Sequence, residues 1–327
     1  MLKLITIGDF LDTYIHIKQK GINTVLSKIG LNKNKQIKNK WNDKQNINGF
    51  WNIPFFMTHW NKLITDNANV GYPEYFCKKY LINSHSYKLL SIGCGTGFYE
   101  REFAQQCYQD KKRCFSEIVG IELSENRVKE AEKLASENNL NIKYLNQNFY
   151  DIDFKNERFD VILFNSSLHH FDNVEMFLYK HIKPLLNENG FLIICEYVGK
   201  NRLYIPDFQL KEINKLLKAI PIKYRKYAGI SNYKHKVYSP GFIRMKLNDP
   251  SEAVDSEAIL PTLHKYFTVL EEKQLGGNLF VQLMRGIAHN FTNDAPETKQ
   301  ILQTLLDADV NFVKQYNISD FVFGVYR

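Results

Sequence analysis

The chain has 327 residues, 44% of them hydrophobic and 24% charged, so it can bury the core of a full α/β domain and carry further elements. No apolar run reaches the roughly 18 residues that a membrane-spanning helix requires, and charges scattered through the first residues argue against a secretory signal. Five cysteines without a C-x-x-C pair favour free thiols in a reducing compartment, which predicts a cytoplasmic protein.

The formal net charge of +8 is unevenly distributed along the chain. Residues 1–85 carry a net +7 and residues 200–246 a net +10, so the remainder is net acidic. Basic segments predict an anionic partner such as nucleic acid, a phosphorylated or nucleotide-linked sugar, or a membrane surface. The alternative is a surface that is simply kept solvated by lysines, and the run NKNKQIKNKWNDKQN (residues 32–46) favours it.

The first 85 residues predict a helical extension. Phe10, Leu11, Tyr14 and Ile15 recur at helical spacing, which indicates an amphipathic helix within residues 1–30. A polar linker is expected over residues 31–48. An aromatic cluster follows, which consists of Trp41, Phe50, Trp51, Phe55, Phe56 and Trp60. Residues 71–82 are expected to form a second helix.

The stretch KLLSIGCGTG (residues 88–97) predicts a buried parallel strand that ends in a glycine-rich loop. Gly93, Gly95 and Gly97 allow a tight turn and let backbone amides approach a ligand. A helix expected over residues 99–108 would direct its N-terminus at the same ligand. The pattern is therefore typical of a nucleotide-type binding loop.

A second strand is predicted over residues 117–122, and it ends in Glu122. Ser124 is a good N-cap for the helix that follows. In a doubly wound sheet, a carboxylate at the end of strand two lies beside the first loop. Glu122 could there accept hydrogen bonds from both hydroxyls of a ribose.

Three further strands complete the first half of the predicted sheet. They cover residues 141–145, 159–164 and 191–195, with a helix over 173–186 and a turn over 187–190 before the last of them. Because the carboxyl ends of parallel strands meet at one edge of the sheet, Glu196 and Tyr197 should border a ligand pocket.

The C-terminal part predicts an insertion followed by two last strands. Residues 208–220 form a clear amphipathic helix inside the basic insertion. Strands are expected over 266–272 and 321–326, with helices over 279–291 and 299–315 between them.

The G-x-G-x-G loop after a strand, the acid at the end of strand two and the sequence SSLHH after strand four resemble class I S-adenosylmethionine-dependent methyltransferases. The resemblance implies an α/β, Rossmann-like, doubly wound seven-stranded sheet whose last two strands form an antiparallel hairpin. It implies S-adenosyl-L-methionine as cofactor and S-adenosyl-L-homocysteine as product. Residues 86–327 would form the cofactor-binding domain, with residues 200–260 as a substrate cap. The extension at 1–85 would be a lid over the site or would pack on the core.

The resemblance also assigns site residues. Asn148 stands where the family usually has an acid that meets the adenine amine. The cofactor-binding residues would be Gly93, Cys94, Gly95, Gly97, Glu122, Leu123, Asn148, Phe149, Asn165 and Ser166. If the acceptor must lose a proton, the candidate bases are His170, His169 and Glu196, with His289 as a weaker candidate. The histidine spacing predicts no metal site.

The resemblance indicates the type of reaction more specifically than it indicates the methyl acceptor. The N/D-P-P-Y/F tetrapeptide of enzymes that methylate base amines is absent. Segments such as EYVGKNRLYIPDFQLKEIN (residues 196–214) resemble bacterial methyltransferases found in surface-polysaccharide contexts. We therefore expect methyl transfer, at oxygen, to a small-molecule or carbohydrate-linked acceptor. The alternatives are an RNA-directed methyltransferase that uses the basic segments, and a non-catalytic protein of this fold that acts through interactions.

Overall fold

The computed structural model describes residues 3–22, 49–82, 85–109 and 114–327. The predicted linker at 31–48 and Trp41 lie outside these residues. Contacts group the chain into two compact units. The sheet unit consists of residues 61–198, 255–273 and 322–327, and the helical unit of residues 1–60, 199–254 and 274–321. The N-terminal residues thus share one unit with most of the predicted insertion.

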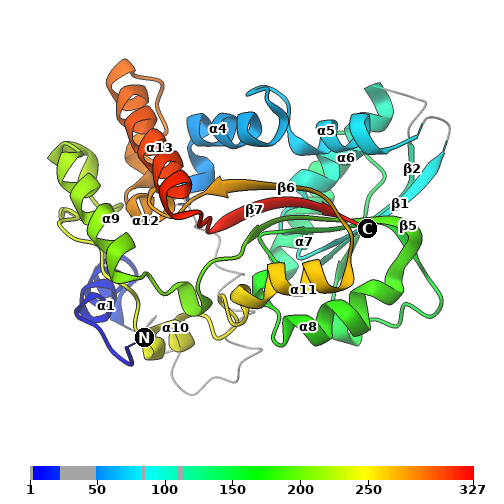
Figure 1. Cartoon of the computed structure of the whole chain (residues 1–327), viewed down its shortest axis with the longest axis horizontal. Helices are drawn as coiled ribbons and strands as arrows, with labels where there is room; N and C mark the ends of the chain where they lie inside the picture. Colours follow the sequence, from blue (N-terminus) through cyan, green and yellow to red (C-terminus); the bar gives the residue numbers. More distant parts are fainter. Residues whose placement is uncertain (1–2, 23–48, 83–84, 110–113) are drawn as a thin grey trace. The chain divides into compact units, whose positions relative to one another are not determined.

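Seven strands form one sheet in the order β3-β2-β1-β4-β5-β7-β6, which confirms the predicted fold class (Figure 1). The strands are β1 (Ser86–Ile92), β2 (Cys114–Glu122), β3 (Lys143–Asn146), β4 (Phe159–Asn165), β5 (Leu186–Tyr197), β6 (Val269–Gly276) and β7 (Phe321–Tyr326).

The directions of the strands indicate at which edge of the sheet a ligand would bind. β1 pairs in parallel with both β2 and β4, and β2–β3 and β4–β5 are parallel as well. The strand order reverses beside β1, and in such sheets ligands bind at the carboxyl ends next to this point. Thr268 and Arg327 exchange two backbone hydrogen bonds of 2.6 and 2.9 Å, as an antiparallel pair does, so the β6–β7 hairpin is also confirmed.

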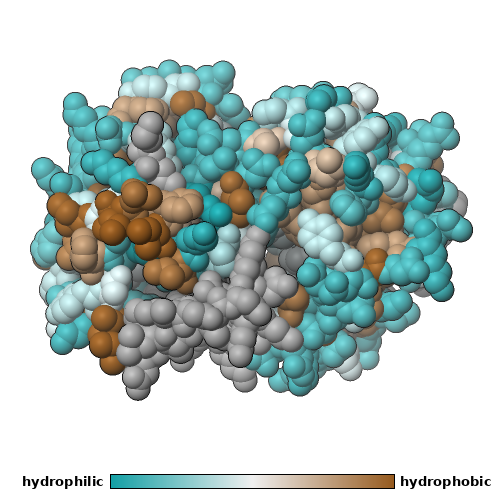
Figure 2. Space-filling view, turned by 90° about the horizontal axis from the view of Figure 1, so that it is seen from below, coloured by the Kyte–Doolittle hydropathy of each residue, from teal (hydrophilic) through white to brown (hydrophobic). Residues whose placement is uncertain are grey.

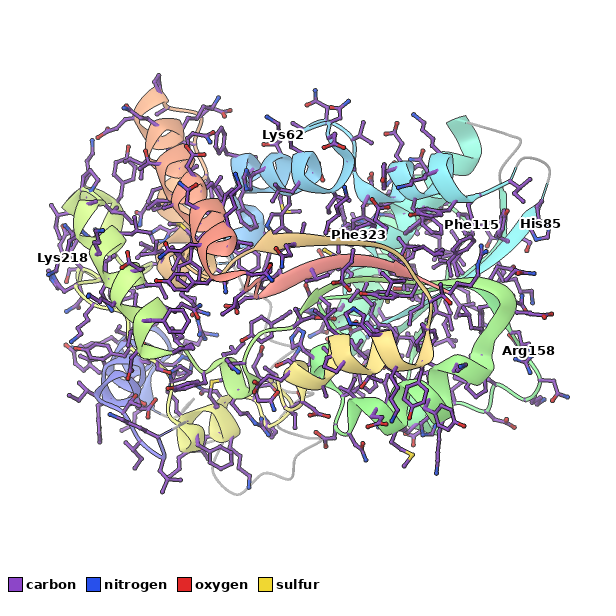
Figure 3. The ribbon with its side chains drawn as sticks, viewed as in Figure 1. Lys62, His85, Phe115, Arg158, Lys218 and Phe323 are labelled. Atoms are coloured by element: carbon purple, nitrogen blue, oxygen red, sulfur yellow. The ribbon has the colours of Figure 1, made fainter. Side chains whose placement is uncertain are left out.

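The sheet is apolar on both faces because helices cover both of them. Leu90, Phe164 and Ile194 on three neighbouring strands are fully buried and belong to one hydrophobic cluster. Phe323 on β7 is fully buried as well, and Figure 3 shows it in the middle of the strand. Continuous apolar runs of this kind are typical of parallel strands buried on both sides.

The helices of the sheet unit are α5 (Tyr72–Tyr80), α6 (Phe98–Gln109), α7 (Glu125–Glu137), α8 (Val174–Phe177) and α11 (Ile259–Tyr266), and α4 (Pro54–Thr65) spans the boundary between the units. Of these, α5, α6 and α7 lie close to the predicted helices, whereas α11 was not predicted from the sequence. The Ser124 side chain accepts a hydrogen bond from the Arg127 amide at 3.4 Å, so it caps α7 as predicted.

Two predictions around β5 were wrong. The single helix expected over 173–186 is divided into α8, a π-helical turn (Leu178–Ile182) and a 3₁₀ turn (Lys183–Leu185). Pro184 lacks the N–H that a continuous α-helix would need at this point. The expected turn at 187–190 instead belongs to β5, whose pairing with β4 shifts register between Phe159 and Val161.

The helical unit contains α1 (Ile7–Lys20), α9 (Asp207–Ala219), α10 (Phe242–Asn248), α12 (Phe280–Met284) and α13 (Pro296–Tyr316). Lys218 lies near the outer end of α9 in Figure 3. Two residues of the aromatic cluster are buried in this unit: the Phe56 ring stacks on that of Phe280 with centroids 4.7 Å apart, and the Trp60 ring lies 5.2 Å from that of Phe321. Within the part of the chain that the structure describes, no helix is both long and apolar enough to cross a membrane.

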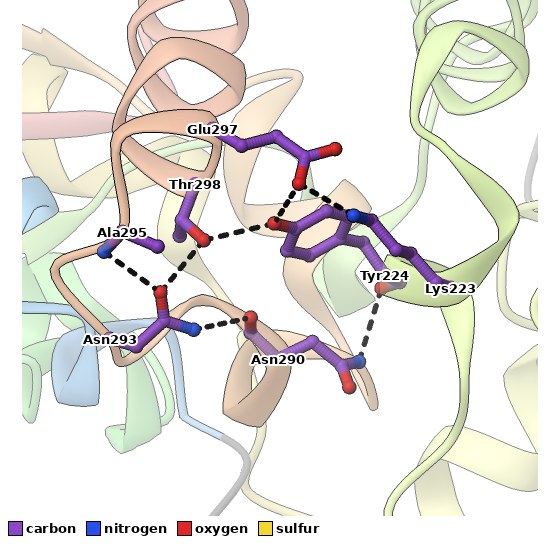
Figure 4. A network of polar contacts seen from close by, with 7 residues as sticks. All are labelled: Lys223, Tyr224, Asn290, Asn293, Ala295, Glu297 and Thr298. Carbon is purple, nitrogen blue, oxygen red and sulfur yellow. Dashed lines mark hydrogen bonds and ion pairs between the residues drawn. The ribbon is translucent and has the colours of Figure 1, made fainter.

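A polar network joins the insertion to the start of α13 within the helical unit (Figure 4). The Lys223 ammonium lies 2.5 Å from the Glu297 carboxylate, and the Tyr224 hydroxyl contacts both Glu297 at 3.1 Å and Thr298 at 3.2 Å. Thr298 in turn donates to the Asn293 side chain at 2.8 Å. The network therefore fixes the first turn of α13 to the basic segment.

Candidate functional site

The glycine loop between β1 and α6 has a backbone that only glycine adopts readily. Gly93, Gly95 and Gly97 have φ angles of +76°, +59° and +70°. A Cβ on Gly93 would lie 2.5 Å from the Cβ of Ser167, and one on Gly97 would lie 2.2 Å from the Tyr144 hydroxyl. The loop thus requires glycine both for its conformation and for the space it leaves.

Backbone contacts tie this loop to the neighbouring strand ends. The amides of Gly93 and Cys94 both donate to the Ile121 carbonyl on β2, at 2.8 and 3.0 Å. The Ser167 hydroxyl, which follows β4, donates to the Ile92 carbonyl at 2.6 Å. Our sequence reasoning missed Ser167, although it is the second serine of the SSLHH motif. The ends of β1, β2 and β4 are therefore fastened to one another around the loop.

Glu122 lies directly beside the loop. Its carboxylate is buried and accepts hydrogen bonds from the Gly95 amide at 3.0 Å and from the Ser124 amide at 2.8 Å, one on each oxygen. A carboxylate offers about four acceptor positions, so each oxygen keeps one for a ligand. Glu122 can thus hold the loop and still accept from a vicinal diol.

The segment after β3 is organised around its own turn. The Asn148 side chain accepts from the Tyr150 amide at 3.2 Å and caps a short 3₁₀ helix (Phe149–Asp151). Phe149 is buried, with its ring 5.3 Å from that of Phe177. The Leu123 carbonyl, at the end of β2, accepts from the Asn146 side chain at 3.0 Å.

The chain turns sharply after β4. Ser166 is exposed and has a left-handed φ of +51°, while its amide donates to the Cys195 carbonyl at 2.9 Å. The half-buried Asn165 accepts from the Tyr72 hydroxyl at 3.1 Å through its side-chain oxygen. Tyr72 comes from α5, and its ring stacks on that of Tyr99 with centroids 4.7 Å apart. A non-glycine residue with a left-handed φ, as at Ser166, is often found at a functional site.

Glu196 and His169 form a buried pair behind that turn. The Glu196 side chain is fully buried, and one of its oxygens accepts from the amides of Ser167 at 2.7 Å and Leu168 at 2.6 Å. The other oxygen accepts from the Tyr197 amide at 2.8 Å and contacts Nδ1 of His169. All four acceptor positions of the carboxylate are therefore occupied by the protein itself.

The two other candidate histidines lie in different surroundings. His170 is half-buried, and its ring centroid lies 4.2 Å from that of His169. His289 belongs to the helical unit, where burial and then the nearby Lys226 lower the pKa of its imidazole. The sheet unit thus brings His169, His170 and Glu196 together at the ends of β4 and β5.

A model of the methyltransferase-domain family matches residues 83–248, which is about half of the chain. The chain belongs to this family of methyltransferases. The match covers the glycine loop, Glu122, the turn after β4 and the His169–Glu196 pair. The family is that of class I S-adenosylmethionine-dependent methyltransferases.

Curated relatives are distant. This methyltransferase is 28% identical to the ubiquinone biosynthesis O-methyltransferase of Rickettsia conorii over 121 residues, 36% of this chain and 37% of that protein. It is 23% identical to the sterol 24-C-methyltransferase of Debaryomyces hansenii over 265 residues, 76% of this chain and 66% of that protein. The chain thus spans little more than a third of the first relative.

Solved structures resemble this methyltransferase only loosely. The plantazolicin methyltransferase BpumL, solved with a desmethylplantazolicin analogue and S-adenosylhomocysteine, is 14% identical, with a TM-score of 0.41 over 96% of this chain and 95% of that chain. The [4+2]-cyclase SpnF is 13% identical, with a TM-score of 0.45 over 78% of this chain and 80% of that chain. The family assignment rests on the sequence match.

Glu100, beside the glycine loop, is a buried acid, although the sequence indicates only a carboxylate in the first turn of a helix. Glu100 lies in the first turn of α6, is 2% exposed, and one of its carboxyl oxygens has no hydrogen-bond partner among the described residues. Burial raises the pKa of this carboxyl to about 7, although a hydrogen bond from Ser91 opposes the rise. An acid at a helix start is a common surface feature, so sequence gave no signal of its burial.

Proposed function

We propose that the glycine loop and Glu122 hold S-adenosylmethionine, and that the methyl group goes to a hydroxyl oxygen of a small-molecule or carbohydrate-linked acceptor, with His169 as general base. The observation that carries the proposed base is the hydrogen bond between His169 Nδ1 and the buried Glu196 carboxylate. The cofactor supplies an electrophilic methyl group on a sulfonium sulfur.

The donor set fits this cofactor. Gly93, Gly95 and Gly97 provide a loop without side chains that a ligand can approach closely. The spare acceptor positions of Glu122 suit the two ribose hydroxyls. We do not assign the adenine contact to the Asn148 oxygen, because that oxygen already caps its own turn. The buried ring of Phe149 offers an apolar surface beside it.

Glu196 acts in this proposal through His169 and does not touch the acceptor. A His169 ring that donates its Nδ1–H to Glu196 carries its lone pair on Nε2, which is the form that can take a proton. The carboxylate also stabilises the imidazolium that results. Help of this kind from a general base is worth about 10²–10⁴-fold in rate.

A hydroxyl acceptor explains why a base is needed at all. An alcohol that gains a methyl group must lose its proton, and His169 Nε2 receives it. The distant likeness to an O-methyltransferase is consistent with an oxygen acceptor. The net charge of +10 on residues 200–246 suits an anionic acceptor, such as a phosphorylated or nucleotide-linked sugar.

The test combines an acceptor screen with two histidine variants. The purified protein is incubated with S-adenosylmethionine and panels of sugar phosphates, nucleotide sugars and phenols, and the methylated atom of the product is identified by mass spectrometry and NMR. We expect an O-methyl product. His169→Ala should lower kcat about 10²–10⁴-fold while the cofactor Kd stays unchanged.

His170→Ala is the matched comparison because it removes the adjacent imidazole. Glu196→Gln should shift the pH profile of kcat as well as lower it, which loss of packing alone would not do. A larger loss for His170→Ala than for His169→Ala would make His170 the base. Methylation of RNA, or of carbon or nitrogen, would contradict the proposed acceptor.

A further inference from the structure

Helix α1 is oriented in the helical unit with its apolar face outward. Gly8 and Asp9 are its buried residues, whereas Ile7 is 68% exposed, Phe10 69% and Tyr14 47%. An amphipathic helix on a folded protein normally buries its apolar stripe and exposes its charges. Here a carboxylate is buried and a phenylalanine lies in solvent.

Polar contacts fix this orientation. The Asp9 carboxylate accepts from the Gly241 amide at 2.9 Å, from Nε of Arg244 at 2.9 Å and from the Thr6 amide at 2.7 Å. Arg244 also pairs with Asp12 at 2.5 Å. α1 is thus attached to the start of α10 by hydrogen bonds and ion pairs, which do not use its apolar side chains.

Glycine makes this close docking possible. A Cβ on Gly8 would lie 2.5 Å from the Cβ of Tyr238, and one on Gly241 would lie 2.0 Å from the Asp9 carboxylate. Larger residues at these two positions would push α1 away from the segment that leads into α10. The sequence is therefore suited to holding α1 by its polar side.

Exposed apolar side chains also lie on the residues before α1 and on α10. Figure 2 shows apolar residues gathered on the side seen from below, where α1 and α10 lie in Figure 1. A group of exposed apolar side chains on one face of a protein commonly marks an interaction site. We call it the α1 face, and it consists of Leu4, Ile5, Ile7, Phe10, Leu11, Tyr14, Ile243 and Leu247.

The charges around the α1 face are mainly positive. Residues 3–20 and 242–248 contain five Lys and Arg against two Asp. Both aspartates pair with Arg244, which balances one of their two negative charges, so the four lysines leave these residues with a net charge of +3. Lys3, Lys18 and Lys246 are exposed at or near the edges of the face.

We propose that the α1 face binds the surface of a lipid bilayer that contains anionic headgroups. A helix that carries aromatic and aliphatic side chains on one face and lysines beside them lies in the plane of the interface. The 14 residues of α1 extend about 21 Å, which is enough to lie along the headgroup region. Each lysine near an anionic surface adds attraction that salt screens.

The charge pattern favours a bilayer over a second copy of the chain. Two α1 faces placed against each other would bring lysines of like sign together, which is unfavourable at an interface. An anionic bilayer instead complements these lysines while it covers the apolar side chains. This inference is independent of the identity of the methyl acceptor.

Vesicle flotation tests the proposal with the full chain. Wild type is mixed with vesicles of phosphatidylcholine alone or with added phosphatidylglycerol, and the bound fraction is measured at low and high salt. We expect binding to the anionic vesicles that salt weakens. Phe10→Ser with Leu11→Ser should lower the partition coefficient about tenfold or more, because two apolar side chains no longer leave water.

Two variants serve as controls. Ile222→Ser with Ile318→Ser removes side chains that are 47% and 43% exposed elsewhere on the helical unit, and it should bind vesicles like wild type. Lys18→Glu with Lys246→Glu should abolish the preference for anionic vesicles. Melting temperatures establish that each variant is folded.

Three results would overturn the proposal. The first is a folded wild type that binds neither kind of vesicle, and the second is equal binding by wild type and the Phe10/Leu11 variant. The third is a wild-type dimer in solution that this variant converts to monomer, since the face would then be an interface between copies of the chain.

Discussion

The glycine loop of the sheet unit and helix α1 of the helical unit use the same residue types in opposite ways. Around the loop, apolar strands are buried, and the buried carboxylate of Glu122 accepts backbone amides at the ligand edge. In α1, the buried carboxylate of Asp9 attaches the helix, and the apolar side chains lie in solvent. The sheet unit buries its apolar side chains and keeps a carboxylate beside the glycine loop, whereas α1 buries a carboxylate and exposes its apolar side chains.

The difference shows what hydrophobic periodicity measures. The spacing of Phe10, Leu11 and Tyr14 identifies a helix, because these residues recur on one side of it. It does not identify which side faces the protein, since that depends on the partners available. For α1 the partners are the Gly241 amide and Arg244, so the polar side is buried. Substitutions can therefore distinguish a buried apolar side chain from an exposed one, and a glycine that the fold requires from one that can be replaced.

The largest effect on cofactor binding is expected for Gly97→Ala. The added Cβ would meet the Tyr144 hydroxyl at 2.2 Å, and φ at +70° disfavours any side chain. We expect a destabilisation of about 2–4 kcal/mol, and cofactor affinity should fall about 100-fold or more. Calorimetric titration and thermal unfolding measure both effects.

Gly229→Ala is the matched control because Gly229 has a φ of +71° but nothing lies within 4 Å of an added Cβ. It should cost only the conformational strain, about 1–2 kcal/mol, and leave cofactor affinity unchanged. Equal losses for the two variants would mean that the close contact at Gly97 is unimportant.

A pair of phenylalanine substitutions tests the burial comparison. Phe164 on β4 is fully buried, so Phe164→Ala should cost about 3–5 kcal/mol. Phe10 is 69% exposed, so Phe10→Ala should change stability by less than about 0.5 kcal/mol. Urea unfolding measures both, and a loss above about 2 kcal/mol for Phe10→Ala would show that α1 buries this ring in solution.

A smaller effect is expected for Glu100→Gln, and it depends on pH. Burial raises the pKa of Glu100 from 4.5 to about 7, so the folded protein binds more protons than the unfolded chain between these values. Below pH 4.5 the carboxyl is protonated in both states and costs no stability. As pH rises through 7 the buried carboxyl must ionise, so the folded protein loses stability. Glu100→Gln should therefore be more stable than wild type by roughly 2–3 kcal/mol at pH 8, and similar to it at pH 5. A difference independent of pH would contradict this ionisation.

Much of the sheet unit could be predicted from local sequence. Continuous apolar runs closed by glycine or by an acid give strands and a ligand edge with few alternatives, as for β1 with Gly93 and β2 with Glu122. The π-helical turn after α8 and the extended residues 187–190 of β5 could not be predicted, because they depend on how Pro184 and the strand register are accommodated in three dimensions.

The sequence indicates which segments form the candidate site, but it does not indicate which of their side chains contact one another. SSLHH and Glu196 mark the ends of two strands, but only the fold shows that Glu196 accepts the Ser167 and Leu168 amides and contacts His169. Tyr72 is distant in sequence from Asn165 and donates to it through tertiary packing. Contacts between residues far apart in the chain leave no local pattern.

The most direct test of the account is cofactor binding by wild type and Glu122→Ala, measured by calorimetry and thermal shift with S-adenosylmethionine and S-adenosylhomocysteine. Wild type should bind both saturably and melt at a higher temperature by mass action. Glu122→Ala should bind about 10–100-fold more weakly, while Glu125→Ala, three residues along the chain and exposed, should bind like wild type. If folded wild type binds neither ligand, or Glu122→Ala binds as tightly as wild type, the proposed cofactor site is wrong.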